Sequence, residues 1–303
     1  MSAEELRAAL PMTEAIDALE EAFGSGVLPV SPLRSHVSTG DGDLLLMPST
    51  GAAGAGVKLV TVNRSNPGRG LPLIHAVYVL FERGTLEPLA VIDGGALTSL
   101  RTGAVSGLAT RHLADPAVSR LVIFGAGVQA NSHLEAMCAV RPIAEVRIVG
   151  RSIDRTDALI ERAGRMGLVA SAAGPEAASW ADIVCTCTTS SEPLFDGESL
   201  KEGAHVNAVG AYTPDTRELD EHAVARGRVV VETREAALTE AGDLMMAIAA
   251  GSFRAEDIVA DLSEVVRGAT VRASPRDITI FKSVGVAFED LSVARAAFDR
   301  LRA

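Results

Sequence analysis

Alternating apolar and polar positions predict a β-rich first segment that follows a helix over 14–23. Clusters of Gly, Pro, Asn and Asp separate the candidate strands and indicate turns. No helical pattern lies between these strands, so we expect them to pair antiparallel. The candidate strands span 34–37, 43–47, 57–62, 73–81 and 89–92.

Small and apolar residues at helical spacing predict a helix over 95–113, which ends before the stop signal Asp115-Pro116. Beyond it, short apolar strands alternate with helical stretches, a pattern typical of βαβ units and a parallel sheet. These strands cover 120–124, 145–149, 183–188 and 229–231, and the helices cover 129–140 and 156–166. A last strand over 278–281 precedes an amphipathic helix over 286–301, which we expect to pack back on the first domain.

The pattern as a whole predicts an α/β protein with two domains, in keeping with a length of 303 residues. We expect a Rossmann domain with a parallel, doubly wound sheet over 114–278. A smaller α+β domain, discontinuous in sequence, is expected over 1–113 and 279–303.

The composition of the chain disfavours some classes of binding partner. The formal net charge is −11, which disfavours nucleic acids and anionic membranes because both need clustered Lys and Arg. No apolar run approaches the roughly 18 residues of a membrane span, and the N-terminal segment has neither the basic nor the apolar part of a signal peptide. The sequence therefore favours a cytoplasmic protein.

The three cysteines do not indicate a metal centre. Cys185 and Cys187 lie in an apolar run, where they are expected to serve as small core side chains. A metal or redox pair would need further Cys or His ligands at suitable spacing, and the sequence offers none. No metal is expected.

The strongest local motif is Gly125-Ala126-Gly127-Val128-Gln129-Ala130, which follows a buried strand and opens a helix. Gly125 permits the tight turn, and Gly127 lets a pyrophosphate approach the backbone. Ala130 takes the place of the third Gly, where helix and strand pack closely. The motif predicts a dinucleotide held at the helix N-terminus.

The end of the second Rossmann strand distinguishes NAD from NADP, because a carboxylate there binds the ribose 2′-hydroxyl whereas a 2′-phosphate needs donors. Here the sequence is Gly150-Arg151-Ser152. Arg151 and Ser152 can bind a phosphate and no carboxylate repels it, so NADPH is favoured, with NADH possible. In the alternative interpretation, Arg151 is an ordinary solvated charge.

Three basic residues of the first domain have unusual surroundings. Arg34 and Lys58 lie on predicted strands, and Arg101 lies in a helix among apolar neighbours. A buried cation needs an anionic partner to offset its desolvation. Spacing alone leaves open whether that partner is a substrate carboxylate or a protein carboxylate.

These residues belong to a wider pattern that resembles the ornithine cyclodeaminase/mu-crystallin family of NAD(P)-dependent enzymes. The resemblance runs along nearly the whole chain. It rests on Leu46-Met47-Pro48, Gly56-Val57-Lys58-Leu59-Val60, Asn66-Pro67, Gly70-Leu71-Pro72, Leu80-Phe81, Asp93-Gly94, Leu100-Arg101-Thr102-Gly103-Ala104, the dinucleotide turn, Gly210-Ala211, Pro214-Asp215, Arg217-Glu218-Leu219, Glu240-Ala241-Gly242-Asp243 and Phe281-Lys282-Ser283-Val284-Gly285.

The resemblance implies a Rossmann domain plus a smaller domain whose sheet forms a homodimer interface, with the substrate between the domains. It implies that Arg34, Lys58 and Arg101 clamp the substrate carboxylate and orient its α-carbon for hydride transfer. The implied cofactor contacts are Arg101, Thr102, Gly125–Gln129, Gly150, Arg151, Ser152, Thr188, Thr189, Val209, Gly210, Ser283 and Gly285.

Departures from the family pattern bear on the substrate. Cyclodeaminases place an Asp in the loop where this chain has Tyr212, and a Glu where it has Leu45. A Thr that often follows Gly-Leu-Pro is Leu73 here, which leaves one contact near the nicotinamide unfilled. Loss of both acids removes a general base and a partner for a side-chain ammonium.

Without these two acidic side chains, the substrate pocket implied by the resemblance is more apolar and suits a substrate with an apolar ring. Met47, Leu45 and Leu73 are expected to line it, with Tyr212 shaping the wall and His75 on the same strand face as Leu73. The alternatives are a Tyr212 that donates a hydrogen bond and a His75 satisfied by backbone groups.

The resemblance therefore implies a reductase of small cyclic ketimine carboxylates such as Δ1-pyrroline-2-carboxylate and Δ1-piperideine-2-carboxylate, giving proline and pipecolate. A protonated ketimine is already an electrophile, so no strong acid is needed. Alternatives are an alanine dehydrogenase or an ornithine cyclodeaminase of the same family, or a crystallin-like protein that binds NADPH and a small ligand without turnover.

Overall fold

The computed structural model describes residues 1–302 and divides the chain into two compact units. The first comprises Met1–Arg101 together with the C-terminal segment from Val286, and the second comprises Thr102–Gly285. Helix α3 (Gly94–Leu113) belongs to both, because the division falls between Arg101 and Thr102. Asp93 begins this helix by accepting a hydrogen bond from the Ala96 amide at 2.8 Å.

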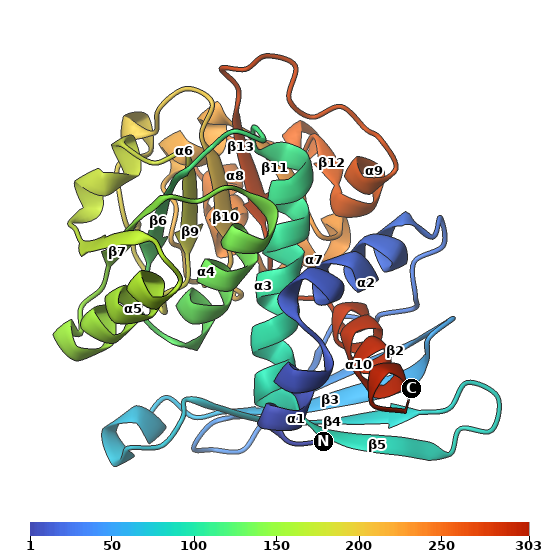
Figure 1. The fold of residues 1–303 in the computed structure, drawn as a ribbon. Helices are drawn as coiled ribbons and strands as arrows, with labels where there is room; N and C mark the ends of the chain where they lie inside the picture. The colour runs from blue at the N-terminus through green and yellow to red at the C-terminus, as the bar shows by residue number, and fades with distance from the viewer. Residues whose placement is uncertain (303) are drawn as a thin grey trace. The chain divides into compact units, whose positions relative to one another are not determined.

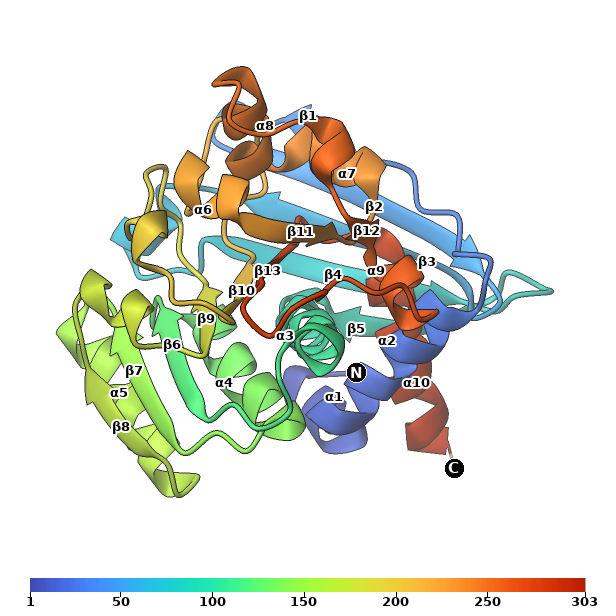
Figure 2. The same ribbon diagram turned by 90° about the horizontal axis from the view of Figure 1, so that it is seen from above.

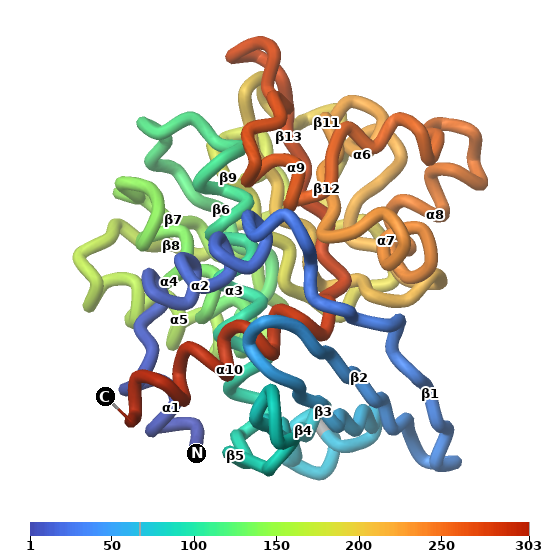
Figure 3. The backbone as a smooth tube through the Cα atoms, turned by 90° about the vertical axis from the view of Figure 1, so that its right-hand side faces the viewer, coloured from blue at the N-terminus to red at the C-terminus, as the bar shows by residue number. Residues whose placement is uncertain are grey.

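The first unit is built on an antiparallel meander in the order β1-β2-β3-β4-β5, which confirms the expected pairing (Figure 1). The strands are β1 (Ser35–Ser38), β2 (Asp43–Gly51), β3 (Gly54–Val62), β4 (Ile74–Phe81) and β5 (Pro88–Asp93). Helices α1 (Ala3–Ala9), α2 (Met12–Gly24) and α10 (Ala287–Arg302) complete the unit. Figure 3 shows α10 running across the strands, where it contacts β2, β3 and β4.

The second unit holds a sheet of eight parallel strands in the order β12-β11-β13-β10-β9-β6-β7-β8. Its central strand β6 (Arg120–Phe124) is apolar on both faces, as a strand covered by helices on both sides must be. Helices α4 and α5 cover one face, and α6 and α8 cover the other (Figure 2). The predicted α/β fold with a doubly wound sheet is confirmed.

The remaining elements of this unit follow βαβ order. They are α4 (Val128–Val140), β7 (Glu145–Val149), α5 (Ile153–Arg165), β8 (Val169–Ala172), β9 (Ile183–Thr186), β10 (His205–Ala208), α6 (Glu221–Arg226), β11 (Gly227–Val231), α7 (Arg234–Glu240), α8 (Gly242–Ala249), β12 (Ala260–Asp261), α9 (Leu262–Val266) and β13 (Ile278–Lys282).

The unit boundaries differ from the predicted 113 and 279. Strand β13 pairs in parallel with β10 and β11, so the second unit extends to Gly285 instead of ending at 278. At the other end, α3 continues into the second unit from Thr102 onward. Strand β9 ends at Thr186, two residues short of the prediction, because the Thr188 amide donates to a side chain and not to the sheet.

No described helix combines the length and apolar character needed to cross a bilayer.

Within residues 1–302, no group of three or more His, Cys, Asp or Glu side chains is arranged to hold a metal ion. Cys185 is fully buried, and burial raises the pKa of its thiol to about 12.

Two histidines are buried in the second unit. His133 contacts the Gln129 carbonyl at 2.8 Å and the Ser106 hydroxyl at 2.9 Å, and His205 contacts the Thr279 hydroxyl at 2.9 Å. Burial lowers the pKa of His133 from its ordinary 6.5 to about 4, and that of His205 to about 3. Both rings are therefore neutral in the folded protein near neutral pH.

We expect the free energy of unfolding to fall as pH drops from 6.5 towards 4. Between these pH values the histidines of the unfolded chain are protonated, whereas the buried rings of the folded protein stay neutral. The free energy of unfolding therefore rises with pH across this interval, by about 3 kcal/mol for His133 alone. Urea unfolding of wild type and His133→Gln across this range measures the slope. The exposed His222→Gln is the control and should keep the wild-type slope; an unchanged slope in His133→Gln contradicts the assignment.

Candidate functional site

A row of side chains crosses the core face of the meander. The register places Met47, Lys58, Tyr78 and Ile92 side by side on β2, β3, β4 and β5. Residues opposite one another in a sheet point to the same face, and all four are buried. Lys58 is therefore held in an apolar row with its ammonium group out of water.

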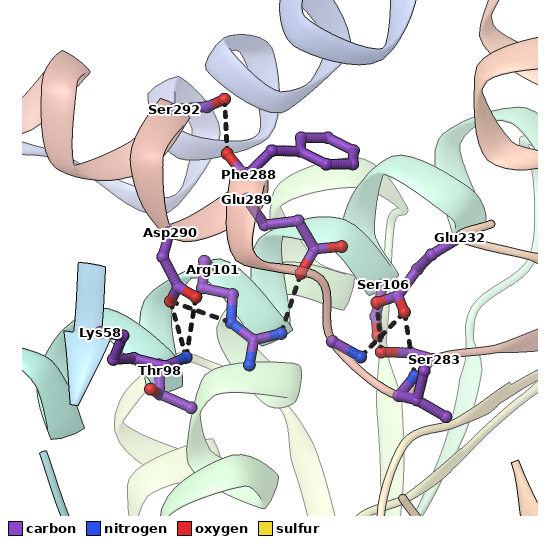
Figure 4. A network of polar contacts seen from close by, with 12 residues as sticks. Lys58, Thr98, Arg101, Ser106, Glu232, Ser283, Phe288, Glu289, Asp290 and Ser292 are labelled. Carbon is purple, nitrogen blue, oxygen red and sulfur yellow. Dashed lines mark hydrogen bonds and ion pairs between the residues drawn. The ribbon is translucent and has the colours of Figure 1, made fainter. Parts of the chain in front are cut away.

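The ammonium group of Lys58 is paired with a carboxylate from the C-terminal helix. Its Nζ lies 2.9 and 2.8 Å from the two carboxylate oxygens of Asp290, which is itself fully buried (Figure 4). Burial lowers the pKa of Lys58 to about 8, and Asp290 opposes that shift. Lys58 is thus charged at neutral pH, although its pKa lies well below the 10.5 of an exposed lysine.

Arg101 joins the same cluster from helix α3. One guanidinium nitrogen lies 2.8 Å from Glu289, and Nε lies 3.4 Å from Asp290 (Figure 4). Arg34 is half-buried and close enough for its charge to help lower the pKa of Lys58. The structure therefore brings together all three cations that the sequence singled out.

Glu289 and Asp290 were not predicted from the sequence. An amphipathic helix normally turns its acidic residues to solvent, but residues 287–294 of α10 are all buried. The signal that could have revealed them is an acidic pair between Phe288 and Leu291 in an otherwise apolar stretch. The alternative of a protein carboxylate as partner for the buried cations is thus realised here.

The apolar residues expected around the substrate lie together in one cluster, and His75 lies apart from them. Leu45 and Met47 are buried in one cluster with Val60, and Leu73 packs against it. His75 is exposed, and it lies three residues before Tyr78 on β4, so strand alternation places the two side chains on opposite faces. Leu73 precedes β4 and lies outside this alternation. His75 therefore does not share a face with Leu73, Lys58 or Met47.

Tyr78 packs tightly beside Lys58. A Cβ atom at Gly56 would lie 1.9 Å from the Tyr78 hydroxyl, so only glycine fits there. The buried hydroxyl has no hydrogen-bond partner among the described residues. Burial, and then the nearby charge of Asp290, raise the pKa of Tyr78.

The second unit contains the predicted dinucleotide turn between β6 and α4. Gly125 has a φ of +105°, and a Cβ there would lie 2.6 Å from the Cys187 carbonyl oxygen. A Cβ at Gly127 would meet nothing within 4 Å, so the turn is open on that side. Helix α4 has no side-chain cap, which leaves its first amides available to an anion.

Buried polar atoms near this turn also fit a cofactor. The side-chain oxygens of Gln129 and Thr102 are buried, and the described residues offer them no hydrogen-bond partner. Buried polar atoms are normally satisfied, so these oxygens suit a ligand with hydrogen-bond donors. The open turn and the uncapped helix fit the pyrophosphate of a nicotinamide dinucleotide, and the two oxygens fit the donor hydroxyls of its ribose.

The other predicted cofactor residues follow the carboxyl ends of parallel strands, which meet at one edge of the sheet. Gly150, Arg151 and Ser152 come after β7 and are exposed, and the Ser152 hydroxyl caps α5. The rest lie in three loops: Thr188 and Thr189 after β9, Val209 and Gly210 after β10, and Ser283 and Gly285 after β13. Tyr212, which was predicted for the substrate pocket, is half-buried in the loop after β10.

The sequence of the whole chain identifies its family. A profile of the ornithine cyclodeaminase/mu-crystallin family matches residues 1–303. The chain belongs to this family. That membership confirms the resemblance drawn from the sequence motifs.

Several relatives within the ornithine cyclodeaminase/mu-crystallin family are reductases. Δ1-pyrroline-2-carboxylate reductase of Bacillus cereus is 39% identical, covering 99% of this chain and 95% of the relative. The ketimine reductase mu-crystallin of Rattus norvegicus is 37% identical, covering 95% and 90%. A solved structure of Thermococcus litoralis Δ1-pyrroline-2-carboxylate reductase, in complex with NADH and L-proline, is 34% identical with a TM-score of 0.95, covering 100% and 97%.

The buried pair makes a strong prediction for stability. Replacing Lys58 with Met should lower the free energy of unfolding by about 3 to 5 kcal/mol, because Asp290 loses its main partner while buried. The double variant Lys58→Met/Asp290→Asn should lose less than the single one, since no uncompensated carboxylate remains.

Urea unfolding of both variants provides the measurement. Arg295→Ala is the control, because Arg295 pairs with Asp299 on the more exposed part of the same helix and should contribute less than about 1 kcal/mol. Equal losses in Lys58→Met and Arg295→Ala would contradict the buried pair.

Proposed function

We propose that this protein is an NAD(P)H-dependent reductase of small cyclic ketimine carboxylates. Its substrates would be Δ1-pyrroline-2-carboxylate and Δ1-piperideine-2-carboxylate, reduced to proline and pipecolate. The B. cereus and T. litoralis relatives support this reaction. The homodimer that we also propose follows from the family resemblance.

The charge cluster of the first unit carries the proposal. Arg34, Lys58 and Arg101 supply three positive charges, and Glu289 and Asp290 supply two negative ones. The five groups therefore retain one positive charge, which one substrate carboxylate neutralises. Lys58 donates two hydrogen bonds to Asp290 and keeps a third N–H for the substrate.

In this mechanism the three cations bind and orient the carboxylate next to the C=N bond. The apolar side chains of Leu45, Met47 and Leu73 pack against the ring and exclude water. When bound, NAD(P)H would supply a hydride to the imine carbon. The protonated nitrogen keeps its proton as the electron pair of the C=N bond moves onto it, so no residue has to act as a strong acid.

The side chains at the two distinguishing positions oppose amine elimination. Leu45 is buried and apolar, and Tyr212 is a half-buried phenol, so neither offers a carboxylate as general base. The cluster would also accept pyruvate, and alanine dehydrogenase activity is therefore the second candidate. Both alternatives are tested by the same assay.

NADPH is the proposed preferred cofactor, with NADH also accepted. Arg151 and Ser152 follow β7 in exposed positions, where a 2′-phosphate needs donors, and the Gly150-Arg151-Ser152 segment itself contains no carboxylate. A ribose 2′-hydroxyl can use the same donors less strongly.

Turnover tests the proposal directly. Oxidation of NAD(P)H is followed by absorbance with Δ1-pyrroline-2-carboxylate, with pyruvate plus ammonia, and in reverse with ornithine plus NAD. We expect rapid oxidation with the ketimine alone. Ammonia release from ornithine, or binding of NADPH with no turnover of any substrate, would overturn the reductase assignment in favour of the cyclodeaminase or the crystallin-like protein.

Arg34→Gln should lower kcat/KM for the ketimine about 10- to 100-fold, because one charged hydrogen bond to the carboxylate is lost. Arg34 is partly exposed, so the variant should fold. The control is Arg83→Gln, an exposed arginine of the same unit, which should keep wild-type kinetics. Equal kinetics in the two variants argue against the clamp.

Arg151→Ala should raise KM for NADPH about tenfold or more and leave KM for NADH within a factor of about two. Steady-state kinetics with each cofactor measures this. Arg165→Ala, at the far end of α5 and exposed, is the matched control. A parallel loss with both cofactors would contradict recognition of the 2′-phosphate by Arg151.

A further inference from the structure

Two buried glutamates hold the loops at the carboxyl edge of the parallel sheet. Glu218 and Glu232 are respectively 0% and 1% exposed, and their carboxylates accept hydrogen bonds from backbone amides and hydroxyl groups. Carboxylates out of water are costly unless hydrogen bonds satisfy them. Both are satisfied almost entirely by the loops that follow β9, β10 and β13.

Glu218 joins the first two of these loops. One carboxylate oxygen accepts hydrogen bonds from the Thr188 amide and hydroxyl, both at 2.7 Å. The other accepts from the Thr186 hydroxyl at 2.6 Å and the Gly210 amide at 2.7 Å. Four donors from two strand ends therefore converge on one side chain.

Glu232 holds the third loop in the same way. One oxygen accepts from the Ser283 hydroxyl at 2.6 Å, and the other accepts from the amides of Val284 at 3.0 Å and Gly285 at 2.8 Å (Figure 4). Glu232 follows β11, the strand that pairs with β13. The loop after β13 is thus fixed from the neighbouring strand.

Asp243 and Lys282 fix Glu218 itself. One oxygen of Asp243 accepts from the amides of Glu218 and Leu219 at 2.7 and 2.8 Å. Lys282 lies 2.7 Å from Asp243 and donates to the Ala211 carbonyl at 2.6 Å. The backbone that carries Glu218 is therefore anchored to β13 and to the loop after β10.

We propose that Glu218 and Glu232 are positioning residues that pre-form the three cofactor loops of this enzyme. The inference rests on the proposed function, because only there do Thr188, Gly210, Ser283 and Gly285 contact the nicotinamide cofactor. Loops already ordered in the free protein lose less conformational entropy when the cofactor binds. Loss of either carboxylate should weaken cofactor binding without touching the cofactor directly.

The two glutamates respond differently to an amide in place of the carboxylate. Glu218→Gln has one acceptor oxygen for two backbone amides on opposite sides, so its NH2 group must face either Thr188 or Gly210. Glu232→Gln can turn its oxygen to the amides of Val284 and Gly285 and donate to the Ser283 hydroxyl. The first substitution breaks a loop contact, and the second preserves all three.

The test is a titration of each protein with NADH, followed by nicotinamide fluorescence, with kcat and KM measured in parallel. We expect Kd for NADH to rise about tenfold or more in Glu218→Gln and Glu232→Ala, and to stay within a factor of about two in Glu232→Gln. At saturating cofactor, kcat should change less than KM. Glu221→Gln, a partly exposed glutamate of the same unit, is the control.

Thermal unfolding identifies variants that fail to fold. If Glu218→Gln does not fold, the comparison of Kd for NADH between Glu232→Ala and Glu232→Gln decides the inference. Equal NADH affinity in Glu232→Ala and Glu232→Gln, or wild-type affinity in a folded Glu218→Gln, overturns the positioning role. Failure of the wild-type protein to bind NADH overturns the proposed function instead, so the two failures are distinguishable.

Discussion

Pairing of buried charge is the constraint on which both units depend. In the first unit, Lys58 and Asp290 are 232 residues apart in sequence, and their contact joins the C-terminal helix to the meander. In the second unit, Lys282 and Asp243 link β13 to the start of α8. Removal of one partner from such a pair costs more than an average hydrogen bond, because the remaining charge stays out of water. The first of these pairs joins the two sequence segments that make up the discontinuous first unit.

The same cations serve stability and, in our proposal, substrate binding. The sequence left open whether Lys58 faces a protein carboxylate or a substrate carboxylate, and the geometry accommodates both. Lys58 donates two hydrogen bonds to Asp290 and has a third N–H group that a ligand carboxylate can accept. A cluster already held by protein carboxylates also needs little rearrangement when a ligand carboxylate enters.

Much of the fold could be predicted because its signals are local. The buried strand β6, the turn with Gly125 and Gly127 and the alternation of strands and helices all depend on short stretches of sequence. The edge strand β8 has no buried residue, so it shows no apolar pattern to detect. The short helices α6 to α9 lack the several turns over which a helical period becomes visible.

The site was less predictable because its contacts are long-range. Glu289 and Asp290 follow an ordinary helical pattern, and only the tertiary structure shows that this part of α10 is buried on all sides. His75 was assigned to the wrong face because strand alternation was extended to Leu73, one residue before β4 begins. Glu218 and Lys282 belonged to recognised family motifs, but their hydrogen-bond partners come from other loops.

The central claim is that this protein transfers hydride from a nicotinamide cofactor to the imine carbon of a cyclic ketimine carboxylate. The most direct measurement uses cofactor with deuterium at both C4 positions of the reduced nicotinamide ring, with Δ1-pyrroline-2-carboxylate as acceptor and mass spectrometry of the product. The account predicts proline with one deuterium at the α-carbon. Proline without deuterium, or no proline from a protein that binds the cofactor, would contradict it.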